Sequence, residues 1–379
     1  MTDQMTQAHL RDAALEDAVA ITEFLVRLGL VMPAGEAAIR AHWDALWRTN
    51  PALKHHGGHP ALGWVLEDAG SIVGFFGNIP QVAYFQGRPV TISSARAWAV
   101  DKAYRGQTPQ LCAAFFGQTG ADVALISSAN APAGKRCLEF GASAMPQPGY
   151  GEILYWVLDA GGFLRAGLKK KGYGGFAAFM GGLLGAVVLN ARMRLGGQRP
   201  FSALDGITIK RVEEIDDAFD GLWRRKLKET PDRLLACRDS DTLRWYFGLS
   251  QTSPDTRIIC FDRGAGLDGY AVVVRESVPA IGLRRIKVAD LFVAGDDPAV
   301  ADALLTAAFE YGLAKRCHVL EVIGLAEPLR DRALVHKPFK RPMAVFPFYY
   351  KALNEDLEGP LASADGWAVT AYDGDTALL

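Results

Sequence analysis

The sequence predicts a mixed α/β fold in which two similar α+β units, each built on a mixed sheet, follow one another along the chain. With 379 residues, the chain exceeds the length of about 100–200 residues that is usual for one domain. Short apolar strands alternate with helices in both halves, and a glycine-rich apolar segment separates the halves. We therefore expect a first unit over 1–160, a linker over 161–205, a second unit over 206–355 and a tail over 356–379.

The first half begins with a strand and two helices, continues with three strands, and ends with two helices that alternate with two strands. Helical spacing of apolar residues predicts the helices, and apolar runs bounded by turn residues predict the strands. Gly141 is a typical C-terminal cap for its helix. In chain order the expected ranges are 9–11, 15–28, 35–48, 61–67, 72–85, 90–100, 109–118, 123–127, 132–140 and 150–158.

The second half repeats this order of elements, although few residues repeat. Strands are expected at 207–211, 257–261, 269–274, 286–293, 319–323 and 343–350, and helices at 215–226, 234–249, 299–315 and 327–335. The tail after residue 356 is polar and weakly patterned. The repetition indicates a duplicated architecture.

The composition excludes several classes of protein. Hydrophobic residues make up 50% of the chain, which excludes a mainly disordered protein. The formal net charge is -1, so no overall positive field would hold a phosphate backbone, and we expect no nucleic-acid partner. The 5 cysteines are dispersed and the N-terminus is polar, which together predict a cytoplasmic location.

The segment 172–191 has no charged residue and is flanked by Lys169, Lys170 and Lys171 on one side and by Arg192 and Arg194 on the other. Its length would span a bilayer, and Gly181 and Gly185 have the spacing of close helix contacts. Six of its twenty residues are glycine, which weakens helix propensity. Three interpretations stay open: a spanning helix, peripheral membrane contact, and a buried linker between the units. We favour the linker.

A candidate phosphate site lies where the strand over 90–100 ends. The chain there passes through a turn at Arg105 and Gly106 into a helix that begins near Pro109. Backbone N–H groups at such a helix start, together with the helix dipole, bind anions. We therefore expect a pyrophosphate to be held by the candidate cofactor-binding residues, which are Arg105, Gly106, Gln107, Thr108, Pro109 and Gln110.

At this point the chain resembles the GNAT superfamily of acyl-CoA-dependent N-acyltransferases. The resemblance covers residues 8–158, whereas the second half is similar only in the order of its elements. The segments that carry it are HLRDAALEDA at 9–18, the strand pair over 65–77, VDKAYRG at 100–106, SAN at 128–130 and CLEFGA at 137–142.

The resemblance implies direct transfer of an acyl group, expected to be acetyl, from acetyl-CoA or another acyl-CoA to the amine of a small molecule or peptide. The family's fourth and fifth strands, here 96–100 and 123–127, separate to admit pantetheine. Backbone groups near Trp98 and Val100 would hold the cofactor and polarise the thioester, and Asn130 lies in the segment after the fifth strand. No metal is implied.

This sequence departs from the family pattern at several positions. Thr108 and Gln110 replace glycines of the pyrophosphate loop, and Cys137 stands where many relatives have a tyrosine that protonates the leaving thiolate. Cys137 is therefore our candidate acid and Asp101 our candidate base. The alternatives are that Cys137 is simply a small buried residue and that Asp101 is an exposed turn carboxylate.

The segment 54–59 contains His55, His56 and His59. Three histidines so close together could bind zinc or copper, but no fourth ligand is near. The alternatives are contact with the acceptor and a solvated loop, and we expect no metal.

The second unit has Asp296 and Asp297 at the position where a diphosphate would need to lie, so we expect it to support the first unit and not to catalyse. Two other functions stay open. A Fem-like aminoacyl transferase also joins two such domains, but its tRNA donor fits the neutral charge poorly. A non-catalytic acyl-CoA-binding or regulatory protein would fit the altered loop and Cys137.

Overall fold

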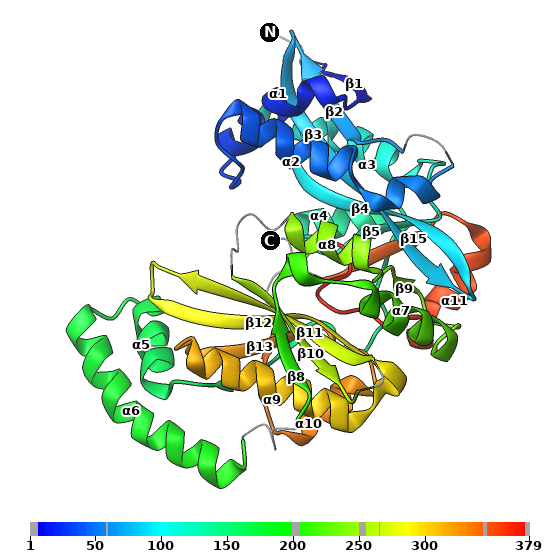
Figure 1. Cartoon of the computed structure of the whole chain (residues 1–379). Coiled ribbons are helices and arrows are strands. Elements are labelled where there is room, and N and C mark those ends of the chain that lie inside the picture. Colours follow the sequence, from blue (N-terminus) through cyan, green and yellow to red (C-terminus); the bar gives the residue numbers. More distant parts are fainter. Residues whose placement is uncertain are drawn as a thin grey trace.

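A computed structural model describes residues 7–57, 60–198, 205–249, 255–264, 266–343 and 347–375. Two mixed sheets lie one above the other in the view of Figure 1, with helices packed against each. The expected fold class, a mixed α/β structure, is confirmed.

The first sheet is built mainly from the first half of the chain. Its strands follow the order β1-β2-β3-β4-β5-β15-β6, and β9 pairs with β3. The strands are β1 His9–Asp12, β2 Gly63–Asp68, β3 Ser71–Phe85, β4 Arg88–Val100, β5 Val123–Ile126, β6 Ser143–Ala144, β9 Leu235–Ala236 and β15 Tyr349–Ala352.

The second sheet has the order β14-β7-β13-β12-β11-β10-β8. Its strands are β7 Glu152–Val157, β8 Ile207–Lys210, β10 Thr256–Asp262, β11 Leu267–Val278, β12 Leu283–Val293, β13 Val319–Ile323 and β14 Phe339–Pro342. Each sheet has one parallel pair among its described strands, β4 with β5 and β12 with β13. The two pairs lie at corresponding places, which is the structural evidence for duplication.

The two units exchange their last strands, which the sequence pattern did not predict. We expected the strand over 150–158 to complete the first unit, but β7 pairs with β13 and β14 of the second sheet. Conversely, β15 comes from the end of the second half and pairs with β5 and β6 of the first sheet. The strand expected over 343–350 overlaps β15 only at residues 349–350, and β14, which was not expected, ends before that range at Pro342. Residues 344–346 lie outside the described residues.

The helices follow the predicted order closely in both units. The helix expected over 234–249 is shorter than predicted, because its first residues form β9 against β3. The described helices of the two units are α1 Ala18–Arg27, α2 Glu36–Trp47, α3 Thr108–Phe116, α4 Ala131–Glu139, α7 Asp217–Glu229, α8 Ser240–Gly248, α9 Pro298–Ala314, α10 Leu329–Val335 and α11 Glu358–Ala362.

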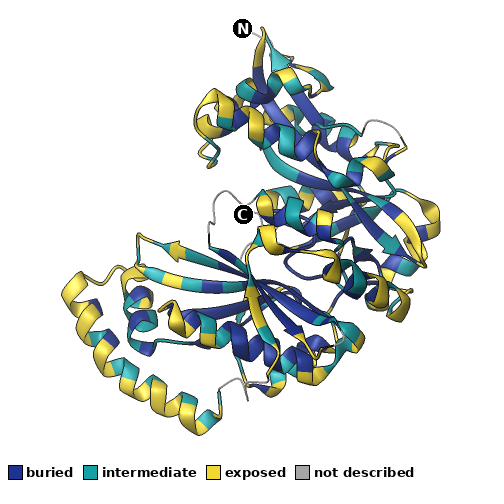
Figure 2. Ribbon diagram, in the orientation of Figure 1, coloured by how far each residue is buried: buried dark blue, intermediate teal, exposed yellow. Residues whose placement is uncertain are grey.

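The expected linker is a helical hairpin. Helix α5 spans Ala160–Lys170 and α6 spans Gly175–Gly196, so the glycine-rich run that we interpreted as a buried linker is helical. Most of α6 is exposed, as the yellow ribbon at its position in Figure 2 shows. Packing against α5 stabilises the helix although glycine lowers its propensity.

The tail is buried, contrary to the polar and weakly patterned segment that we expected. Residues 369–375 are all buried. Tyr372 belongs to the largest hydrophobic core, together with Trp43 and Phe75 of the first unit and Tyr270 of the second. This core is continuous between the units, so the sheets share one interior.

A buried ion network fixes the tail between the sheets. The Arg238 guanidinium donates hydrogen bonds to Asp290 at 2.9 Å and to Asp373 at 3.2 Å. Burial opposes the charge of Arg238, but these carboxylates raise its pKa. Removal of one partner from such a network costs about 3–5 kcal/mol, because a buried charge is left uncompensated.

The strand exchange predicts that the first unit does not fold alone. A fragment of residues 1–160 lacks β15, which lies between β5 and β6, and carries β7 without its partners. We expect the fragment to show no cooperative thermal transition by near-ultraviolet circular dichroism, whereas the full chain unfolds cooperatively. A fragment with a native-like cooperative transition would contradict this account.

Candidate active site

A cleft opens in the first sheet where two parallel strands separate. β4 pairs with β5 only from Ile92 to Ser94, yet β4 continues to Val100. From Ala95 onward the edge of β4 therefore lacks β5 as a partner, and its backbone groups are open to the cleft. The cleft has a volume of about 1080 Å³ and is lined on this side by every residue from Ala95 to Val100.

A β-bulge shapes β4 along the cleft. Phe75 pairs with Ala99 and Gly77 pairs with Arg96, so Ala97 and Trp98 stand opposite the single residue Phe76. Ala97 has a φ of 54°, the left-handed value that a bulge imposes on one residue. The Trp98 ring stacks on Phe76 with centroids 4.7 Å apart, which fixes the side chain at the cleft.

The mouth of the cleft is the start of α3. The chain reaches α3 through the 3-10 helix Lys102–Gln107 (η3), and Arg105 and Thr108 line the cleft. Gly106, Gln107, Pro109 and Gln110 belong to the same turn but are not cleft-lining residues. Gly106 has no positive φ, so the tight glycine turn that we expected is a 3-10 turn instead.

The two units differ at this helix start. No side chain caps the N-terminus of α3, but the Thr108 N–H donates to the Arg105 carbonyl and Pro109 has no N–H. An anion at this helix start would therefore be held mainly by the Arg105 and Thr108 side chains and by the positive end of the helix dipole. At the corresponding place in the second unit, the Asp297 carboxylate accepts a hydrogen bond from the Ala299 N–H at 2.8 Å and caps α9. Asp296 lies 2.6 Å from the Lys226 ammonium. Both carboxylates thus lie at the start of the helix that follows β12 of the second sheet.

Asn130 lies at the start of α4. Its side-chain oxygen accepts a hydrogen bond from the Ala133 N–H at 3.0 Å and so caps α4. Asn130 also lines the cleft, next to Ser128. Trp98, Val100, Arg105, Thr108 and Asn130 are therefore the predicted cofactor-binding residues that the fold brings together.

Asp375 from the buried tail lines the same cleft, and the sequence pattern did not indicate it. Its Oδ1 accepts a hydrogen bond from the Ser127 hydroxyl at 2.6 Å, and its backbone N–H donates to the Ser127 oxygen at 2.9 Å. Its Oδ2 lies 3.6 Å from the Arg96 Nη1. That Nη1 is buried and has no hydrogen-bond acceptor among the described residues, so a ligand oxygen would satisfy it.

His42 of α2 also lines the cleft. Burial, and then the positive charge of Arg96, lower the pKa of His42 to about 4. The imidazole is therefore neutral at physiological pH. Sequence reasoning missed His42 because it stands alone on a helix, without neighbouring residues that mark a site.

The structure does not place the two predicted catalytic residues in the cleft. Cys137 is fully buried in α4, and burial raises the pKa of its thiol to about 12. A thiol so weakly acidic cannot protonate a CoA thiolate, since a free thiol has a pKa of about 8.5. Asp101 is not a cleft-lining residue and forms an ion pair with Arg27 at 2.9 Å.

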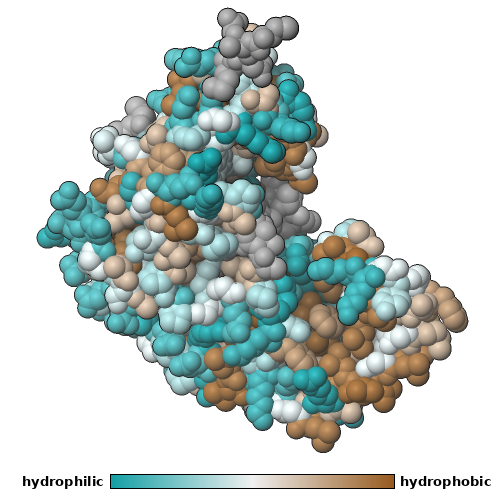
Figure 3. All heavy atoms as spheres, turned by 180° about the vertical axis from the view of Figure 1, so that it is seen from behind, coloured by the Kyte–Doolittle hydropathy of each residue, from teal (hydrophilic) through white to brown (hydrophobic). Residues whose placement is uncertain are grey.

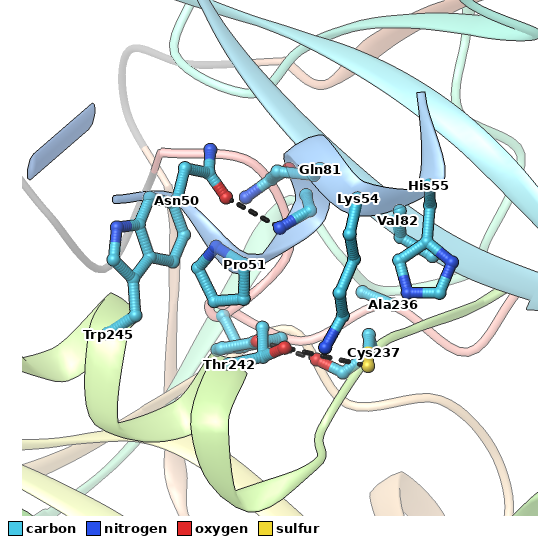
Figure 4. A pocket seen from close by; sticks show the side chains of 12 residues that line it. Asn50, Pro51, Lys54, His55, Gln81, Val82, Ala236, Cys237, Thr242 and Trp245 are labelled. Carbon is cyan, nitrogen blue, oxygen red and sulfur yellow. Dashed lines mark hydrogen bonds between the residues drawn. The ribbon is translucent and has the colours of Figure 1, made fainter. Parts of the chain in front are cut away.

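The histidine segment does not form a metal site in the part that the structure describes. Both ring nitrogens of His56 face backbone carbonyls, of Gly120 at 3.3 Å and of Gln81 at 3.2 Å. His55 and Lys54 border a small cavity of about 20 Å³, shown in Figure 4, which has room for about one water molecule. His59 lies outside the described residues, which hold no group of three metal-ligating side chains.

Comparison with solved structures identifies the architecture. A GCN5-related N-acetyltransferase from Anabaena variabilis superposes with a TM-score of 0.57 at 11% identity, over 92% of this chain and 73% of that chain. One from Kribbella flavida gives 0.55 at 12% identity, over 93% and 73%. The protein has the GNAT fold. A probable N-acyltransferase from Enterococcus faecalis gives 0.56 at 11% identity, over 92% and 73%.

At the level of sequence, no family model and no curated protein matches the chain. The assignment of the GNAT fold therefore rests on similarity in three dimensions. It agrees with the sequence resemblance that we found over residues 8–158. Within this fold the opening between β4 and β5 is the cleft described above.

His42 predicts a specific dependence of stability on pH. Between the ordinary histidine pKa of 6.5 and the folded value of about 4, the unfolded chain binds a proton at this residue and the folded protein does not. The free energy of unfolding therefore falls as the pH falls through this window. In urea unfolding, His42→Gln should reduce this loss by about 1–2 kcal/mol.

His9→Gln is the matched control, because His9 is exposed. The pH dependence of its stability should equal that of the wild type. An unchanged pH dependence in His42→Gln would show that His42 titrates normally in the folded protein.

Proposed function

We propose that the protein is an acyltransferase that moves an acyl group, acetyl in the simplest case, from an acyl-CoA to an amine. The observation that carries this proposal is the parallel pair β4–β5, which pairs over three residues and then opens into a cleft of about 1080 Å³. Such a volume suits a ligand larger than a typical metabolite, since most ligand pockets measure about 300–1,000 Å³.

The elements around the cleft supply the groups that an acyl-CoA needs. The unpaired backbone edge of β4 from Ala95 to Val100 would hydrogen-bond the pantetheine amides, as a neighbouring strand would. The start of α3, with Arg105 and the Thr108 hydroxyl, would bind the diphosphate. The Trp98 ring also lines the cleft and would give an apolar wall for the pantetheine arm.

The acceptor would enter from the other wall, where both units contribute. Leu30, Val31 and Met32 form an apolar edge, and Val274 and Glu276 come from β11 of the second sheet. Burial would raise the pKa of Glu276, but hydrogen bonds from Arg285 and Lys287 lower it overall. The apolar edge favours an acceptor with an apolar portion, whereas the Glu276 carboxylate is already paired with Arg285 and Lys287.

The chemistry needs a group that accepts a proton from the amine. The amine nitrogen attacks the thioester carbonyl, the C–S bond breaks, and the CoA thiolate leaves. The Asp375 carboxylate takes the proton that the nitrogen loses. The thiolate is a good leaving group without an acid, so Cys137 is not needed.

A non-catalytic acyl-CoA-binding protein is the second candidate. The burial of Cys137 favours it, because the thiol that stands in place of the family's acid cannot donate a proton. The two functions make the same prediction for CoA binding and differ in turnover. A Fem-like aminoacyl transfer is disfavoured by the neutral charge of the chain.

The phosphate end of the cleft gives the first test. Arg105→Glu should weaken acetyl-CoA binding at least about tenfold in isothermal titration calorimetry, because a carboxylate would repel the diphosphate. Lys102→Glu makes the same charge change in the same 3-10 helix, but Lys102 is exposed and outside the cleft. The affinity of the Lys102→Glu variant for acetyl-CoA should stay within about twofold of that of the wild type.

Absence of binding to acetyl-CoA and to longer acyl-CoAs would overturn the proposed donor. Equal weakening in the two variants would show that the diphosphate does not lie at Arg105.

The role of Asp375 gives the second test. Asp375→Asn should lower kcat about 100-fold with little effect on acetyl-CoA affinity, and the residual rate should rise with pH as free amine accumulates. The control Cys137→Ala should keep kcat and KM while the free energy of unfolding falls by about 1 kcal/mol. Both are measured as thiol release with an amine panel. A wild-type kcat and pH profile in Asp375→Asn would exclude Asp375 as the base.

A further inference from the structure

Helix α6 packs against α5 through small residues on one face. A Cβ added to Gly181 would lie 2.7 Å from the Leu168 Cδ1, and one added to Gly185 would lie 2.9 Å from the Leu164 Cδ1. At Gly182 it would lie 2.4 Å from the Arg165 side chain. The glycine spacing seen in the sequence therefore brings α6 close to α5. This contact holds α6 to the edge of the second unit.

The opposite face of α6, which we call the outer face, is apolar and exposed. Its side chains include Phe176 (81% exposed), Leu183 (57%), Leu184 (67%) and Val187 (71%). Within the helix only Ala178 and Gly182 are buried. Figure 3 shows the brown hydrophobic spheres gathered over this part of the molecule. A helix that is apolar on every side is normally buried in a core or in a membrane.

The charges of the hairpin have one sign. Between Ala160 and Gln198 the sequence has no Asp or Glu. Lys169, Lys170 and Lys171 are exposed at the turn before α6, and Arg192 and Arg194 are exposed near its end. Both ends of the apolar outer face are therefore basic, and the face between them is neutral. This arrangement complements an anionic membrane surface, where lysine and arginine reach the headgroups while the apolar part enters the acyl region.

Geometry favours a helix in the plane of the membrane over one that spans it. Among the described residues, α6 is the one helix that is long and apolar enough to cross a bilayer. Its glycine face is occupied by α5, and α5 follows directly after β7 of the second sheet. A spanning α6 would need to leave this contact, whereas an in-plane α6 keeps it and buries the outer face.

We propose that the α5–α6 hairpin docks the protein on anionic lipid bilayers, with the outer face of α6 in the interface and the basic residues at both helix ends on the headgroups. The alternative occupant is a second copy of the same face. Two such helices place basic ends beside basic ends in the parallel and in the antiparallel arrangement, so charge repulsion opposes that pairing. The proposal is independent of the acyl-transfer function.

The test is vesicle flotation of the full chain, with bilayers of phosphatidylcholine alone or of a roughly 7:3 mixture of phosphatidylcholine and phosphatidylserine. The wild type should float with the mixed vesicles, and less so with phosphatidylcholine or at high salt. The double variant Leu183→Glu, Val187→Glu should reduce the bound fraction at least about tenfold. Replacement of Lys169, Lys170 and Lys171 by glutamine should weaken binding to the mixed vesicles only.

The matched control is Leu313→Glu with Val335→Glu. These side chains are 45% and 55% exposed on α9 and α10 of the same unit, and their replacement should leave flotation unchanged. A wild type that floats with neither vesicle, or a loss of binding as large in the control, would overturn the proposal. A dimer in sedimentation that Leu183→Glu, Val187→Glu dissociates would assign the outer face to a second copy instead.

Discussion

The exchange of β7 and β15 between the two sheets is the constraint on which the rest of the structure depends. In the first sheet, β15 from the second half of the chain pairs with β5. In the second sheet, β7 from the first half pairs with β13. The return of the chain to β15 brings its last described residues back to the first sheet, where Gly374 accepts a hydrogen bond from Tyr246 and Asp375 binds Ser127. The buried tail therefore completes the cleft, and the Asp375 carboxylate that we propose as the base is in place only when both units have folded.

The second unit acts through what it contributes to the first. Its own helix start is capped by the Asp297 carboxylate, whose negative charge disfavours an anion there. Its β11 supplies Val274 and Glu276 to the acceptor wall of the cleft, and its Arg238 network holds the tail. The β11–β12 hairpin also turns at Gly282, near the Lys169 ammonium of the lipid-docking hairpin. One sheet thus connects the cleft to the surface that we propose for the membrane.

Local pattern in the sequence predicted most strands and helices, because alternation and helical spacing depend on neighbouring residues. It missed three short strands, β6, β9 and β14, and the helices α5, α6 and α11. It could not assign β7 and β15 to their sheets, since an apolar strand fits either sheet equally well. We did not predict helices α5 and α6 because the many glycines of this segment lower its helix propensity. The contact of Gly181 and Gly185 with α5, which stabilises α6, is tertiary and cannot be read from local sequence. At the site, the strand–turn–helix pattern indicated Arg105 and Thr108, and the resemblance indicated Trp98, Val100 and Asn130, all of which line the cleft. The resemblance also indicated Cys137, and Asp101 was chosen by its place at the end of the strand, but neither lines the cleft. Asp375 was missed although the apolar run from Trp367 to Tyr372 indicates a buried tail.

The most direct test of the account is a crystal structure of the protein with CoA. The account predicts that the pantetheine arm lies between β4 and β5, that the diphosphate contacts Arg105 and Thr108, and that the CoA sulfur lies on the side of the cleft that Asp375 lines. CoA bound elsewhere, or a cleft in which the tail fills the space between Arg96 and Asn130, would contradict it.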